Sequence, residues 1–480
     1  MRPFHPLAAV ALAGCGAMSG DSSWTASGGG YGYPTVTMSI LQETQPESEE
    51  PVECEAPVPA PLYISPDDSN SMSSAVQARE AVLGSFGSLR WTAIRTWEFL
   101  NYYTFAYAPA PPGELRVELD LVEDSVADQF RLQIGIASGP ASVEPMNVAL
   151  VIDDSGSMYG EPLAAAVDVG RAIAASLREG DVVSLVEWSH TQDVRLEARP
   201  VSGPNDAALL DALDELVAGG STNLSAGLAT GYELLERNFD PEIINRLILI
   251  SDGGANVGVT DEERIGEAAG NEDEEGVYLV GVGVGTPDTY NDVLMDTVTD
   301  LGKGASVFVP DTAEANLMFT ERFASTVGVA ARDVQIRLDL PAGFSIVRTS
   351  AEEISTNPEE VRPQHVSPGD AMVLHQTLAS ACPDPAPELP VSVTVTWLDP
   401  ITFEPREATV SSTLGELMAQ DHVLLRKGAA VVAYVDALKA EQDDTHPEAL
   451  GAARRAVTDA QLLAPGDADL AEIEAVLAAL

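Results

Sequence analysis

The chain has 480 residues and a formal net charge of −50 at pH 7, from 75 acidic and 25 basic residues. Its length suffices for about two to four domains, and the 45% hydrophobic content can fill their cores. So acidic a surface repels phosphate backbones, and no Lys/Arg-rich run offsets it, which argues against a nucleic-acid partner.

The first 15 residues have the pattern of an export signal. A basic start is followed by an apolar, Ala-rich run over residues 4–14, the order typical of secretory signals. Residues 12–15 read Leu-Ala-Gly-Cys, which resembles a bacterial lipobox, and that resemblance implies lipidation at Cys15. An ordinary signal with a chance cysteine is the alternative. We expect a lipid-anchored protein of the bacterial cell envelope, either periplasmic or surface-exposed. Gly16, which follows the cysteine, favours the outer membrane. No later run approaches the ~20 apolar residues of a membrane span.

Residues 16–74 are rich in Gly, Ser, Pro and Glu and lack apolar periodicity, so they predict a flexible acidic linker. Two further cysteines, Cys54 and Cys382, stand in Pro- and acid-rich settings. In an oxidising compartment they can pair as a disulfide, and two free thiols are the alternative.

Residues 75–144 predict an N-terminal extension with β strands. The stretch 90–107 is dense in aromatic residues, which usually pack as core, and we interpret it as a cap on a β domain. Residues 115–122 and 131–136 then alternate apolar and polar side chains, as half-buried antiparallel strands do.

The segment Asn147–Met158 reads N-V-A-L-V-I-D-D-S-G-S-M. Its apolar run predicts a buried strand of a parallel sheet, and sites in open α/β sheets form at the ends where such strands stop. Asp153, Ser155 and Ser157 follow that strand and offer the oxygen ligands that Mg²⁺ prefers. Taken alone, this pattern fits an Asx or Ser turn before a helix better than it fits a metal site.

Two distant segments complete a pattern. Residues 219–224 read G-G-S-T-N-L and place Thr222 just before a helical run, and residues 246–253 form a second apolar strand that ends at Asp252. With the first segment, these resemble the von Willebrand factor type A (VWA) domain and its metal-ion-dependent adhesion site. The resemblance implies a bound Mg²⁺, or Mn²⁺ or Ca²⁺, with five contributing residues: Ser155, Ser157 and Thr222 as direct ligands, and Asp153 and Asp252 acting mostly through water.

The expected fold is α/β: a doubly wound, Rossmann-like VWA domain over residues 145–330, inserted in or flanked by an antiparallel β domain. Alternating strand and helix patterns indicate the first part. Residues 331–412 change to a period of two and predict the β domain, which the strands of residues 115–136 would join. Residues 413–480 predict C-terminal helices, the first over residues 414–439. The resemblance extends to a bacterial lipoprotein type, in which a short extension precedes the VWA domain and an uncharacterised region follows it.

We find no catalytic constellation: the sequence has no H-E-x-x-H pair, no G-x-S-x-G elbow and no Walker loop. The expected function is therefore extracytoplasmic binding or scaffolding, in which an Asp or Glu of a protein partner completes the metal's coordination. A Mg²⁺-dependent assembly factor or enzyme of the cell envelope is the alternative.

Overall fold

The computed structural model describes residues 57–66, 70–84, 89–140, 145–241, 243–254, 276–445 and 448–480. The predicted signal, the lipidation site Cys15 and Cys54 lie outside the described residues. Cys382 is disulfide-bonded, and its partner also lies outside them, so the pairing with Cys54 stays a prediction.

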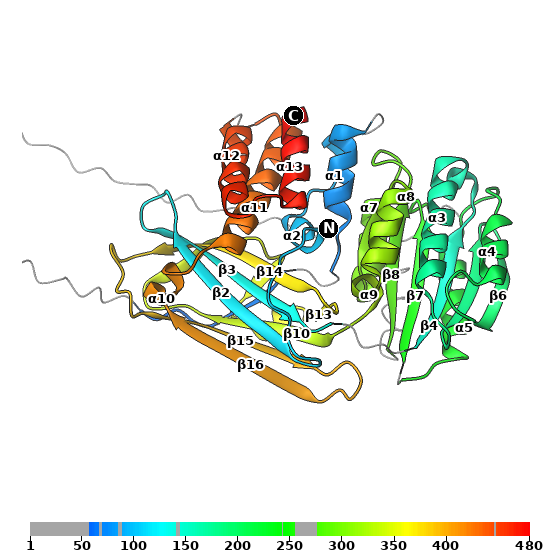
Figure 1. Ribbon diagram of the computed structural model, residues 1–480, viewed down its shortest axis with the longest axis horizontal. Helices are drawn as coiled ribbons and strands as arrows, with labels where there is room; N and C mark the ends of the chain where they lie inside the picture. Colours follow the sequence, from blue (N-terminus) through cyan, green and yellow to red (C-terminus); the bar gives the residue numbers. More distant parts are fainter. Residues whose placement is uncertain are drawn as a thin grey trace, which may run out of the picture. The chain divides into compact units, whose positions relative to one another are not determined.

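A six-stranded sheet in the order β6-β5-β4-β7-β8-β9 forms the α/β domain (Figure 1). All neighbouring strands are parallel except β5 and β6. The strands are β4 (Met146–Asp153), β5 (Val182–Trp188), β6 (Gln192–Pro200), β7 (Ile244–Ser251), β8 (Val277–Val284) and β9 (Ser306–Val309). The helices are α3 (Glu161–Ser176), α4 (Ala207–Asp214), α5 (Leu224–Glu236), α7 (Asp292–Leu301), α8 (Thr312–Asn316), the π-helical turn η3 (Leu317–Glu321) and α9 (Phe323–Val327).

The central strand β4 explains why this sheet forms. Every residue of β4 is buried, as the apolar run of the sequence predicts, and the side chains from Val148 to Ile152 are fully excluded from solvent. Apolar burial of this kind contributes about 25 cal/mol per Å². Strand β6 was not expected. Its residues are mostly exposed or half-buried, so its hydrophobic period is weak.

Two antiparallel sheets form a sandwich beside the α/β domain. One has the order β12-β1-β10-β15-β16, with β13 paired to β10, and the other has the order β11-β14-β3-β2. Their strands are β1 (Leu62–Ser65), β2 (Leu115–Glu123), β3 (Gln129–Ser138), β10 (Ala331–Asp339), β11 (Phe344–Thr349), β12 (Glu353–Ser355), β13 (Gln364–Val366), β14 (Ala371–Ser380), β15 (Pro390–Leu398) and β16 (Pro405–Thr413). Alternate residues of both sheets share one hydrophobic core. Because β1, β2 and β3 precede the α/β domain and the remaining strands of the two sheets follow it, the α/β domain is inserted in the β domain, and the predicted fold class is confirmed.

The linker prediction is wrong at its C-terminal end. Residues 62–65 form β1, which pairs antiparallel with β10 and β12 and buries Ile64 at 1% exposure. Helix α1 (Ser73–Leu83) also begins inside the expected linker. Strand β1 has only four residues, too few to show a period in the sequence, and its partners lie far along the chain.

In the described part of the chain, six α-helices flank the two domains, two from the N-terminal extension and four from the C-terminal region. They are α1, α2 (Thr96–Tyr102), α10 (Leu414–Met418), α11 (Val423–Gln442), α12 (Glu448–Leu463) and α13 (Ala468–Ala479). The expected single helix over 414–439 is thus two, because the chain turns at His422, which has a left-handed φ of 57°. Helix α2 contacts β14 as a cap would, and it also packs on α11 through the rings of Phe99 and Tyr434. Figure 1 shows α11, α12 and α13 packed together, with α1 beside α13.

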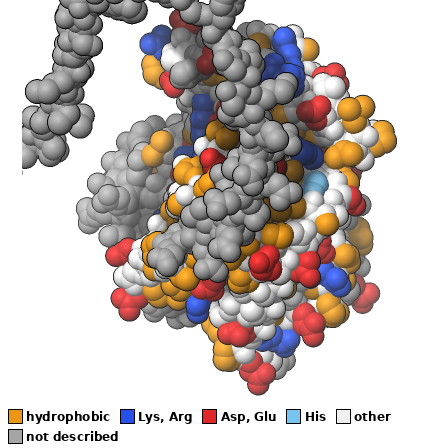
Figure 2. Space-filling model, turned by 90° about the vertical axis from the view of Figure 1, so that its left-hand side faces the viewer, with side chains coloured by type: hydrophobic (Ala, Val, Ile, Leu, Met, Phe, Trp, Pro, Cys, Tyr) orange, Lys and Arg blue, Asp and Glu red, His pale blue; other side chains and the backbone are white. Residues whose placement is uncertain are grey.

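Charged side chains are interspersed over the face drawn in Figure 2, with Asp and Glu scattered among apolar and uncharged groups. The described residues of that face gather no broad basic patch. This distribution is typical of a solvated acidic surface.

A buried histidine in the sandwich predicts a pH dependence of stability. Burial lowers the pKa of His375 from 6.5 to about 3, and Arg131 and Arg348 act in the same direction. In the unfolded chain His375 binds a proton near pH 6.5, so its stabilising contribution is complete above about pH 6.5 and is lost as the pH falls towards about 3. We expect His375→Gln to flatten the dependence of the unfolding free energy on pH in this window, measured by urea denaturation. Equal slopes for His375→Gln and wild type would contradict the expectation.

Candidate metal site

The candidate site begins where β4 ends, at Asp153. This carboxylate is fully buried. Its Oδ1 accepts a hydrogen bond from the Ser155 backbone N–H at 2.8 Å, and its Oδ2 accepts one from the Ser251 hydroxyl at 2.7 Å. Ser251 is the last residue of β7, so Asp153 ties the ends of two neighbouring strands together. Both carboxylate oxygens are thereby engaged by protein donors.

Two hydroxyl groups follow in the turn after β4. The Oγ atoms of Ser155 and Ser157 lie 3.1 Å apart. Ser155 is buried and Ser157 is exposed, so this pair of oxygens reaches from the protein interior to solvent. Such spacing suits two ligands of one small cation.

The loop before α5 is joined to this turn through the backbone. The Gly156 N–H donates to the Gly220 carbonyl at 3.1 Å, and the Gly219 N–H donates to the Asp154 carbonyl at 2.7 Å. Gly220 has a φ of +86°, and a Cβ there would lie 2.8 Å from His190 Nδ1, so a larger residue would not fit. This loop carries Thr222, which is 2% exposed.

The three segments converge beside Gly254. A Cβ built on Gly254 would lie 3.1 Å from Asp252 Oδ1, 3.7 Å from Ser157 Oγ and 3.7 Å from Thr222 Cγ2. The Gly254 backbone N–H also donates to Asp252 Oδ1 at 3.0 Å. The structure thus brings together all five residues that the sequence singled out, from three separate parts of the chain.

The carboxylates of Asp153 and Asp252 are both buried away from water. Burial raises the pKa of Asp153 to about 7; hydrogen bonds from Ser251 and Ser155 oppose the shift, and the charge of Asp252 adds to it. A divalent cation nearby would stabilise the ionised form of Asp153. The donors are three hydroxyls and two carboxylates, which fit Mg²⁺. In the described part of the chain no cluster of three His, Cys, Asp or Glu side chains is placed to hold a metal, so a site here depends on hydroxyl ligands.

Sequence reasoning missed three residues around this site. Ser251 orients Asp153, and its only signal was its position directly before Asp252. The backbone N–H of Asn291 donates to the Asp252 carbonyl at 3.0 Å, and the Asn291 side chain caps α7. Tyr159 follows Ser157 by two residues and is 84% exposed. An exposed aromatic side chain of this kind is common where proteins bind partners.

Comparisons with known proteins identify a related domain family. The model of the von Willebrand factor type A domain matches residues 148–255. The Escherichia coli (strain K12) "Uncharacterized protein YfbK" is 28% identical over 265 residues, which cover 54% of this chain and 43% of that protein. The inter-alpha-trypsin inhibitor heavy chain H2 of Sus scrofa is 28% identical over 195 residues, or 38% of this chain and 21% of that protein. The chain therefore spans about half the length, or less, of the curated relatives it matches.

A solved structure, the "von Willebrand factor type A from Catenulispora acidiphila", covers 78% of this chain and 98% of its own length. Its TM-score is 0.49 at 17% sequence identity.

Proposed function

Since the chain is a von Willebrand factor type A domain protein related to YfbK and to the inter-alpha-trypsin inhibitor heavy chains, we propose that it binds a protein partner through a divalent cation. Ser155, Ser157 and Thr222 would hold Mg²⁺, or Mn²⁺ or Ca²⁺, directly. A carboxylate of the partner, from Asp or Glu, would complete the coordination sphere.

The observation that carries this proposal is how the two aspartates are engaged. Both oxygens of Asp153 accept hydrogen bonds from protein groups, and Oδ1 of Asp252 accepts one from Gly254. The Ser155 and Ser157 hydroxyls lie 3.1 Å apart, and Ser157 and Thr222 both lie beside Gly254, so the hydroxyls are placed to contact one ion together. A cation without a direct carboxylate ligand from its own protein keeps an unneutralised charge, which attracts an acid from outside. The same engagement leaves Asp153 poorly placed to act as a base, so we propose binding and not catalysis.

A pull-down tests the proposal. The full chain, immobilised with Mg²⁺, should capture a partner from bacterial envelope extract and release it when the ion is chelated. Thr222→Ala should capture nothing, whereas Asp154→Ala should capture the partner normally. Capture that is indifferent to chelator and to Thr222→Ala would exclude the metal from the interface.

Removing the ion should lower the melting temperature without unfolding the domain. The core of the sheet, which includes β4 and β7, is formed by buried apolar side chains. A bound ion adds stability by mass action, about 2.7 kcal/mol at a hundredfold excess over its dissociation constant. Far-UV circular dichroism at room temperature should be unchanged by chelator. A loss of signal would show that the metal holds the fold together.

We further propose that the protein is anchored to the bacterial cell envelope through a lipid on Cys15. In the described part of the chain, no helix is long and apolar enough to span a bilayer. Metabolic labelling with a fatty-acid analogue should mark the wild type and leave Cys15→Ser unmarked, while Cys54→Ser should be labelled as strongly as the wild type. Equal labelling of all three proteins would refute the anchor.

A further inference from the structure

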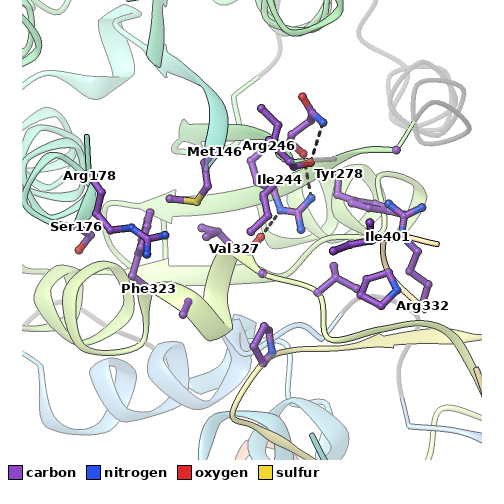
Figure 3. A pocket seen from close by; sticks show the side chains of 18 of the residues that line it. Met146, Ser176, Arg178, Ile244, Arg246, Tyr278, Phe323, Val327, Arg332 and Ile401 are labelled. Atoms are coloured by element: carbon purple, nitrogen blue, oxygen red, sulfur yellow. Dashed lines mark hydrogen bonds between the residues drawn. The ribbon is translucent and has the colours of Figure 1, made fainter. Parts of the chain in front are cut away.

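A concave site lies at the other end of the parallel sheet from the candidate metal site. A cavity of about 500 Å³ opens where β4, β7 and β8 begin, at Met146, Ile244 and Tyr278 (Figure 3). Asp153 and Asp252, by contrast, stand at the opposite ends of β4 and β7. Cavities of roughly 300–1,000 Å³ commonly hold small organic ligands. This cavity is therefore large enough for a ligand and separate from the candidate metal site.

Apolar side chains from both domains form its walls. Phe323 and Val327 come from α9, the last helix of the α/β domain, and Ile401 and Phe403 come from the loop between β15 and β16. Ile401 and Phe403 are 44% and 50% exposed, so this side of the cavity leaves large apolar groups in contact with water. An apolar ligand chain would cover them, which is favourable at about 25 cal/mol per Å².

Two arginines approach the same aromatic ring in this cavity. The guanidinium carbons of Arg246 and Arg332 each lie 4.8 Å from the centroid of Tyr278, and that of Arg332 also lies 4.4 Å from the centroid of Phe403. Arg246 donates from Nε to the Val327 carbonyl, as Figure 3 shows. The Nε of Arg332 is buried and has no hydrogen-bond partner among the described residues. A buried donor without a partner destabilises the protein, so Arg332 can gain a hydrogen bond from a ligand acceptor.

The charge around the cavity is positive although the chain is strongly acidic. Among its described lining residues, one carboxylate, the exposed Glu321, stands against three arginines, Arg178, Arg246 and Arg332. His365, whose ring meets that of Tyr278 edge-on, is subject to the same positive charge. Burial lowers its pKa, and Lys303, Arg332 and Arg246 add to the shift. A ligand for this place therefore combines an apolar body with an anionic head.

We propose that the cavity binds a small amphipathic carboxylate, with its head on Arg332 and its apolar chain between Phe323 and Ile401. A planar guanidinium can donate two parallel hydrogen bonds to a carboxylate, which makes this pairing stronger than one with a neutral group. The stacking on Tyr278 and Phe403 holds that guanidinium in place. Because the cavity and the metal site lie at opposite ends of the sheet, binding should not require a metal ion.

Calorimetric titration of the full chain with octanoate, in the presence of chelator, tests the proposal. Octanoate should bind saturably, whereas octanol, which has the same chain without the charge, should bind at least about tenfold more weakly. The chelator separates this result from the proposed adhesion function, because the two can fail independently. Absence of saturable octanoate binding, or equal affinity for octanol, would overturn the assignment.

Matched variants locate the head group. Arg332→Met keeps a flexible apolar side chain against Tyr278 and should lower octanoate affinity by roughly tenfold or more. Arg332→Lys keeps the charge without the planar fork and should lie between Arg332→Met and wild type. Arg337→Met is the control. Arg337 is an exposed residue of the same strand as Arg332, and its side chain pairs with Asp339. If Arg332→Met melts like wild type and still binds octanoate with wild-type affinity, the carboxylate does not sit on Arg332.

Discussion

Replacing Thr222 by Ala is expected to weaken Mg²⁺ binding by at least roughly 10–100-fold while the domain stays folded, because even groups that only orient ligands are worth that much. Thr222 lies in a loop outside the strands, so removing its hydroxyl deletes an oxygen donor without opening the core. Asp252→Ala should have a similar effect. At Asp153, Asn is the better substitution, since it keeps the shape of a side chain that joins β4 to Ser251.

Asp154→Ala is the internal control for these variants. Asp154 lies between the metal-site residues Asp153 and Ser155, but its backbone groups are bonded to Trp188 and Gly219. Its removal should change the Mg²⁺ dissociation constant much less than the loss of Asp153 or Thr222 does. Calorimetric titration of all the variants is the measurement. If Asp154→Ala proves as damaging as Asp153→Asn, or if every variant binds Mg²⁺ normally, the site assignment is wrong.

Replacing Arg79 by Met is expected to destabilise the protein by about 3–5 kcal/mol, the usual cost of breaking a buried ion pair from one side. Arg79 on α1 pairs with Glu314 on α8 at 2.8 Å and with Glu472 on α13 at 3.1 Å, and it donates to the Tyr102 hydroxyl at 3.0 Å. The Glu314 side chain is only 3% exposed. Burial already raises the pKa of Glu314, so without Arg79 the buried carboxylate would lose its main counter-charge.

Denaturant unfolding of single and double variants measures this cost. Arg79→Met with Glu314→Gln should recover part of the lost stability, because the uncompensated charge is gone. Arg171→Met removes an exposed pair with Asp214 and should cost no more than about 1 kcal/mol. Equal losses for Arg79→Met and Arg171→Met would mean that the network joining α1, α8 and α13 adds no more than an ordinary surface pair.

The candidate site could be predicted from sequence because each of its segments has a local signal. Val148–Ile152 is wholly apolar and stops abruptly at Asp153, which marks both a buried strand and its end. The same is true of the strand before Asp252. Parallel strands bring their carboxyl ends to one edge, so the neighbourhood of these residues follows from the fold class alone. Their convergence beside Gly254 agrees with that expectation; their role as metal ligands stays a prediction.

The features that sequence reasoning missed depend on partners far along the chain. The short strand β1 is held in place by β10 and β12, which lie nearly 300 residues later. The break between α10 and α11 at His422 requires a left-handed backbone conformation, and no glycine stands at that position to signal it in the sequence. Arg332 reads as an ordinary polar position of a strand, and only the packing of β8 and of the loop after β15 surrounds it with Tyr278 and Phe403.

Anomalous diffraction from crystals grown with Mn²⁺ tests the central claim most directly. The account predicts one strong peak within about 2.5 Å of the hydroxyl oxygens of Ser155, Ser157 and Thr222, with the carboxylates of Asp153 and Asp252 reached through water. The peak should vanish in Thr222→Ala crystals and persist in Asp154→Ala crystals. A peak bound directly by both aspartates, or the absence of any peak at this edge of the sheet, would contradict it.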